Sequence, residues 1–162
     1  KSALFGPIPV TIAWLIGGIV LLTWKPTTGS LTLKEMPIRA AFIIGCAQSL
    51  ALWPGVSRSL VTLIAALAVG LSMSAAIEFS FLLGLITLSS ATALDLAKHG
   101  NELVDQFGIL TPTIGLICAF VTAIIAVKWM VGYLASNSLR VFGWYRLAIG
   151  AVCVVLLATN VL

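Results

Sequence analysis

The side chains best suited to chemistry lie in one ten-residue segment, Trp53–Thr62, which reads WPGVSRSLVT. It places Arg58 between two serines, Ser57 and Ser59, and the nearest Asp or Glu in the sequence is at least 20 positions away. A guanidinium flanked by hydroxyls offers several converging hydrogen-bond donors, a geometry that matches phosphate oxygens. The segment therefore predicts an anion site, with phosphate as the favoured ligand.

The residues around Arg58 support this interpretation. Pro54-Gly55 is a strong turn signal, and the glycine lets the backbone bend so that its amides point toward one place. A helix beginning near Ser59 would add unsatisfied N–H groups and the positive end of its dipole. Thr62 lies one turn inside that helix, on the face of Ser59. The alternative is that the two serines only cap the helix, while Arg58 pairs with Glu78 or with a lipid headgroup.

The elements that position this segment are those of a membrane protein. Of the 162 residues, 60% are hydrophobic and 9% charged, whereas soluble domains average about 25% charged residues. A soluble globule and a disordered tail are therefore excluded as classes. The net charge of +4 comes from basic residues that form no run or stripe, so we expect no nucleic-acid partner and assign the charge to membrane insertion.

We expect an all-α integral membrane protein with one membrane domain over residues 1–162. Four apolar runs are long enough to cross a bilayer as helices: about 3–24, 75–97, 111–135 and 142–162. Polar connectors are predicted between them at 26–39 and 98–110, and Trp144, Tyr145 and Arg146 read as an interfacial belt where the last span starts.

The remaining apolar stretch, about 40–71, is divided by Pro54-Gly55 into halves too short to span. Two half-length helices around a break predict a re-entrant hairpin with its tip near mid-membrane. The alternative is one long span broken at Pro54. Arg58 lies at bilayer depth in both cases, where an arginine is a functional-site hypothesis by default.

Pro54-Gly55-Val56-Ser57-Arg58-Ser59-x-x-Thr62 resembles the PGxSRSxxT motif of the undecaprenyl-diphosphatase family, the bacterial membrane enzymes linked to bacitracin resistance. The resemblance covers most of the chain and is strongest over about 41–98. It includes the segments Gln48–Trp53, Glu78–Leu83 and Ala91–Leu96.

The resemblance implies hydrolysis of undecaprenyl diphosphate to undecaprenyl phosphate and inorganic phosphate, which recycles the lipid carrier of cell-wall synthesis at the bacterial inner membrane. It implies a fold of two inverted repeats, each giving a re-entrant helix pair to a shared site. Arg58 would hold the diphosphate, with Ser57 and Thr62 in the same catalytic pocket. Gly55 and Ser59 would complete the substrate-binding set, and a divalent cation, Mg²⁺ or Ca²⁺, would assist.

The chain lacks the family's other signature, E-x-x-x-E followed by a serine and a histidine. Its one histidine, His99, lies in a polar connector and reads as a surface residue. The resemblance therefore places this chain as the C-terminal half, one inverted repeat. We expect the acid, the base and the metal ligands to come from an N-terminal half or across a homodimer. The alternatives are a transporter or flippase of a phosphorylated polyprenyl lipid, or a catalytically dead lipid-binding half.

Overall fold

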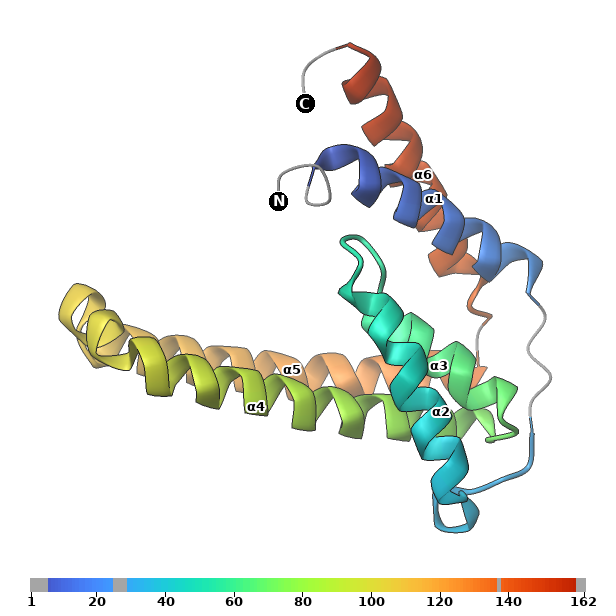
Figure 1. The fold of residues 1–162 in the computed structure, drawn as a ribbon, viewed down its shortest axis with the longest axis horizontal. Helices are drawn as coiled ribbons and strands as arrows, with labels where there is room; N and C mark the ends of the chain where they lie inside the picture. The colour runs from blue at the N-terminus through green and yellow to red at the C-terminus, as the bar shows by residue number, and fades with distance from the viewer. Residues whose placement is uncertain (1–5, 25–28, 137, 160–162) are drawn as a thin grey trace. The chain divides into compact units, whose positions relative to one another are not determined.

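The computed structural model describes residues 6–24, 29–136 and 138–159. Over these ranges the regular structure is helical, and the one bridge between extended residues is isolated, Leu31 with Leu71. The prediction of an all-α protein is confirmed. The chain divides into two compact units, one made of Lys1–Ser80 with Asn137–Leu162 and the other of Phe81–Ser136, which are described separately (Figure 1).

In the described part of the chain, three helices are long and apolar enough to cross a membrane. They are α4 (Met73–Phe107), α5 (Leu110–Ser136, apolar through Tyr133) and α6 (Arg140–Ala158). The first predicted span corresponds to α1 (Pro7–Thr23), whose 17 residues extend about 25 Å. Most large apolar side chains of these helices are exposed, as expected where lipid is the solvent.

In the first unit, α1 and α6 lie against each other (Figure 1). Glycines let the two backbones approach closely. A Cβ added at Gly18 would lie 3.1 Å from the carbonyl oxygen of Gly143, and one added at Gly143 would lie 3.1 Å from that of Gly18. Small residues at such a crossing are the usual means of packing helices in membranes.

The same unit contains the broken stretch around Pro54-Gly55. Helix α2 (Ile38–Gln48) continues into a short 3₁₀ segment, η2 (Ser49–Leu52), and α3 (Arg58–Ala68) begins after the break. Because α2 and α3 pack against each other (Figure 1), the stretch folds back as a helix pair rather than continuing as one broken rod. The re-entrant path of this pair within the membrane stays a prediction.

Two backbone hydrogen bonds join the segment before α2 to the segment after α3. The backbone N–H of Leu31 donates to the carbonyl of Gly70 at 3.2 Å, and Ser72 N–H donates to the carbonyl of Leu31 at 3.0 Å. Beside this bridge, Thr32 opens a 3₁₀ turn, η1 (Leu33–Glu35). The predicted connector before α2 is therefore tied to the turn between α3 and α4.

In the second unit, a polar connector is predicted over 98–110. This prediction is wrong for residues 98–107, because they belong to a helix. Helix α4 runs unbroken through these residues, and only Gly108, with φ of +67°, and Ile109 separate it from α5. The physical reason is that lysine and glutamate are good helix formers, so a helix leaving the hydrocarbon continues into water. At 35 residues α4 is about 52 Å long, well beyond the roughly 30 Å hydrocarbon core.

Candidate functional site

The first turn of α3 forms the candidate site. Ser57 is its N-cap, because its Oγ accepts a hydrogen bond from the backbone N–H of Leu60 at 3.4 Å. The hydroxyls of Ser57 and Ser59 lie 3.2 Å apart and form a hydrogen bond in which either can be the donor. Arg58 and Ser59 are exposed and Ser57 is half-buried. Since no acidic residue lies in this turn, the positive end of the helix dipole is available to an external anion.

Thr62 lies beneath this turn rather than on its surface. The side chain is 2% exposed, and its hydroxyl lies 3.0 Å from the carbonyl oxygen of Arg58 and 3.1 Å from that of Ser59. The same hydroxyl lies 2.6 Å from Oγ of Ser80 in α4. Thr62 therefore ties the start of α3 to α4, a structural role in addition to the substrate contact predicted for it.

Sequence reasoning missed Ser80. Its Oγ also donates to the carbonyl of Ser59 at 3.4 Å, so two hydroxyls from different helices support the same turn. The available signal was the placing of Ser80 between two phenylalanines, Phe79 and Phe81, since a hydroxyl in apolar surroundings needs a partner.

The turn before α3 depends on Gly55. Its φ is +87°, a region that residues with a Cβ rarely adopt. A Cβ at this position would lie 2.8 Å from the carbonyl oxygen and 2.9 Å from the Cα of Val10 in α1. Trp53 Nε1 donates to the carbonyl of Pro9 at 3.4 Å, and Val56 N–H donates to that of Trp53 at 3.1 Å. The loop is thus folded directly onto α1.

Arg146, predicted as part of an interfacial belt, makes its contacts within the first unit. It is half-buried, and its Nη2 donates to the carbonyl oxygens of Gly55 at 3.0 Å and Ala13 at 3.3 Å. Its guanidinium carbon lies 5.5 Å from the ring centre of Trp14. Arg146 lies seven residues into an apolar helix, where an unpaired charge in lipid would be unfavourable. The nearby carbonyls and the aromatic face stabilise its guanidinium instead.

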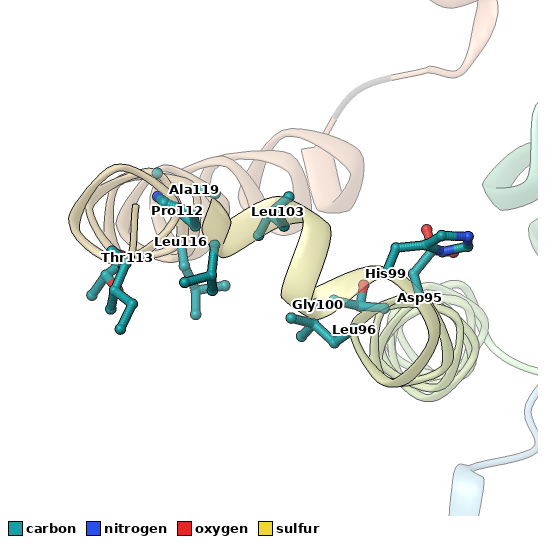
Figure 2. Close-up of a pocket in the computed structure, with 13 residues that line it drawn as sticks. Asp95, Leu96, His99, Gly100, Leu103, Pro112, Thr113, Leu116 and Ala119 are labelled. Atoms are coloured by element: carbon teal, nitrogen blue, oxygen red, sulfur yellow. The ribbon is translucent and has the colours of Figure 1, made fainter. Parts of the chain in front are cut away.

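The residues that the structure describes do not form a carboxylate-rich place fitting a divalent cation. The described part of the chain has no group of three or more His, Cys, Asp or Glu side chains that could hold one. Asp95 Oδ1 and His99 Nδ1 approach to 3.7 Å on α4, but they are only two groups. They line a largely apolar pocket of about 740 Å³ in the second unit, beside Leu103 and residues of α5 such as Leu116 (Figure 2). We derive no step through a metal.

The structure thus brings four of the five predicted residues into one loop and helix start, namely Gly55, Ser57, Arg58 and Ser59, with Thr62 buried below them. This arrangement offers a cation, two hydroxyls and first-turn amides on one exposed surface. It can bind an anion. The segment itself contains no His, Asp or Glu that could act as a general acid or base.

Comparison with known proteins gives consistent results. The chain is 42% identical over 158 residues to a protein of Aquifex aeolicus named undecaprenyl-diphosphatase, and 40% identical over 158 residues to one of the same name from Sorangium cellulosum. These matches cover 94% and 93% of this chain but 61% and 52% of the two relatives, so the chain spans little more than half their length. The profile of the family described as bacitracin resistance protein BacA matches residues 1–152. The chain belongs to the BacA family.

Proposed function

We propose that this chain supplies the diphosphate-binding part of a membrane phosphatase that hydrolyses undecaprenyl diphosphate to undecaprenyl phosphate and inorganic phosphate. The observation that carries the proposal is the exposed Arg58 at the start of α3, between two serine hydroxyls and with no acidic residue in the turn. The names of the relatives support the substrate.

The chemistry divides between binding and proton transfer. Water adds to the terminal phosphorus, the P–O–P bond breaks, and the lipid keeps one phosphate. Arg58 neutralises charge on the transferring phosphoryl group, while the Ser57 and Ser59 hydroxyls and the first-turn amides donate to its oxygens. Phosphoryl transfer depends mainly on such positioning and electrostatics. This segment therefore contributes substrate binding and transition-state stabilisation.

The acid, the base and any Mg²⁺ or Ca²⁺ ligands come, in this proposal, from outside the segment. A carboxylate-bearing partner supplies them, either an N-terminal half or a second copy of this chain. Divalent cations in phosphate sites are held by one or two carboxylates together with substrate oxygens, so a few residues from a partner suffice. We place the assembly in the bacterial inner membrane as a multi-pass protein, with the lipid reaching the site from the bilayer.

The test is release of inorganic phosphate from undecaprenyl diphosphate in detergent, with Mg²⁺ or Ca²⁺. The 162-residue chain is assayed alone and together with the part of the Aquifex aeolicus relative that it does not cover. We expect Arg58→Ala to lower kcat/KM by about 10²–10³-fold, as removal of one key charge-stabilising donor does. The matched control is Arg39→Ala, since Arg39 is an exposed arginine in the first turn of the other short helix, α2.

The outcomes separate the functional classes. Release that is lost in Arg58→Ala and kept in Arg39→Ala supports the proposal. Equal release by both variants contradicts it. A transporter or flippase would bind the lipid without releasing phosphate in either arm, and that result would also reject the proposal.

A further inference from the structure

Arg146 makes a set of contacts that the proposed chemistry does not use. It is the seventh residue of α6, and it reaches from there to two other segments, α1 and the loop before α3. Among the described residues no carboxylate lies within 4 Å of its guanidinium. Its hydrogen-bond partners are backbone carbonyls, which fix where a main chain runs rather than balance a charge.

Helix α1 leaves the space in which the guanidinium lies. A Cβ added at Gly17 would lie 2.9 Å from both Nε and Nη2 of Arg146, closer than real Cβ atoms come. Trp14, one turn earlier, presents its ring at 5.5 Å, within the range of cation–π contact. Glycine at 17 thus leaves the space that the guanidinium fills.

The contact with Gly55 links Arg146 to the turn that presents Arg58. Gly55 holds the positive φ on which the turn depends, and its carbonyl accepts the 3.0 Å bond from Arg146. Arg146 Nε is buried and has no hydrogen-bond partner, a state that is unfavourable for a donor. The guanidinium thus bonds to Gly55 and Ala13 through Nη2, although this placement leaves its Nε donor without a partner.

We propose that Arg146 is a positioning residue that holds the loop before α3, residues Pro54–Ser57, against α1 and so fixes the direction in which Arg58 presents its guanidinium. It acts through Gly55 and does not touch the substrate. The consequence for catalysis rests on the proposed function, whereas the clamp itself does not.

The experiment is hydrogen–deuterium exchange of the full chain in detergent, which needs no activity. We compare Arg146→Met, Arg146→Lys and Gly17→Ala with the wild type. Gly17→Ala keeps the charge but displaces the guanidinium. Gly45→Ala is its matched control, because Gly45 is another helical glycine of the same unit, with open space where the Cβ would be. Phosphate release by the same variants is measured in parallel.

We expect exchange across residues 53–59 to rise at least about tenfold in Arg146→Met and Gly17→Ala, less in Arg146→Lys, and not at all in Gly45→Ala. Where phosphate is released, kcat falls in the same order. Unchanged exchange across 53–59 in both Arg146→Met and Gly17→Ala would overturn the proposal, as would a rise confined to α1 and α6. If Arg146→Met does not fold, Gly17→Ala gives the answer alone. Absence of phosphate release from the wild type, with the uncovered part of the Aquifex aeolicus relative supplied, rejects the proposed function and leaves the exchange result decisive for the clamp.

Discussion

Replacing Gly55 by alanine tests whether the loop before α3 is built as described. An L-residue at φ of +87° is disfavoured by about 1–2 kcal/mol. The added Cβ would also lie 2.8 Å from the carbonyl oxygen of Val10. That oxygen is backbone within α1 and has little freedom to move, so overpacking adds about 1–3 kcal/mol. The two effects together predict a loss of about 2–5 kcal/mol.

Thermal unfolding in detergent, followed by circular dichroism, measures this loss. For a chain of this length each kcal/mol corresponds to a Tm change of about 2–4 °C, so we expect Gly55→Ala to lower Tm by at least about 4 °C. Gly55→Asn separates the two causes, because asparagine tolerates positive φ better but still carries a Cβ. It should fall between wild type and Gly55→Ala.

The matched control is Gly45→Ala in α2, where a Cβ would meet nothing within 4 Å. It should keep or slightly raise Tm, since alanine is favoured over glycine in a helix interior by about 0.5–1 kcal/mol. A Gly55→Ala chain with the Tm of the wild type, and with wild-type hydrogen exchange across 53–59, would refute the argument that this turn requires glycine.

Two further predictions concern polar contacts around the site. Thr62→Val removes the hydroxyl that joins α3 to Ser80, so it should destabilise the chain by about 1–2 kcal/mol. Thr113→Val loses only a local bond, to the carbonyl of Ile109 just before α5, and should change little. Additivity of Thr62→Val with Ser80→Ala in unfolding measurements would show that the two hydroxyls are not coupled. The backbone N–H of Thr32, and to a smaller extent its hydroxyl, donates to the carboxylate of Glu35 and lowers the pKa of this residue below its ordinary value. The stabilisation of the turn is therefore fully present at pH values above the ordinary pKa of glutamate. It is lost as the pH falls through the lowered pKa of Glu35. A carboxyl NMR titration should show this lowered midpoint, moved partly upward in Thr32→Ala; an ordinary midpoint in the wild type would contradict it.

Much of the site could be predicted because its signals are local. Pro54-Gly55 marks the break, and the glycine does adopt positive φ. Ser57 caps α3, and Arg58 follows it at the first helical position. These features depend on the conformational limits of a few consecutive residues, which a single sequence expresses directly.

The parts that could not be predicted depend on contacts between distant segments. Arg146 lies 91 residues from Gly55, and Ser80 lies 18 from Thr62. Neither pairing leaves a periodic pattern. The end of α4 was misjudged for a different reason, because polarity marks where a helix leaves the membrane and not where it ends.

The most direct test of the central claim is binding of a non-hydrolysable analogue, undecaprenyl methylenediphosphonate, to the chain in detergent. The dissociation constants of wild type, Arg58→Lys, Arg58→Ala and Arg39→Lys are compared by isothermal titration calorimetry. Lysine keeps the charge of Arg58 but loses the planar fork that contacts two phosphate oxygens, so we predict at least about tenfold weaker binding in Arg58→Lys. Arg39→Lys should bind like the wild type. Equal affinity in wild type and Arg58→Lys, with Arg58→Ala also unchanged, would contradict the assignment of this site.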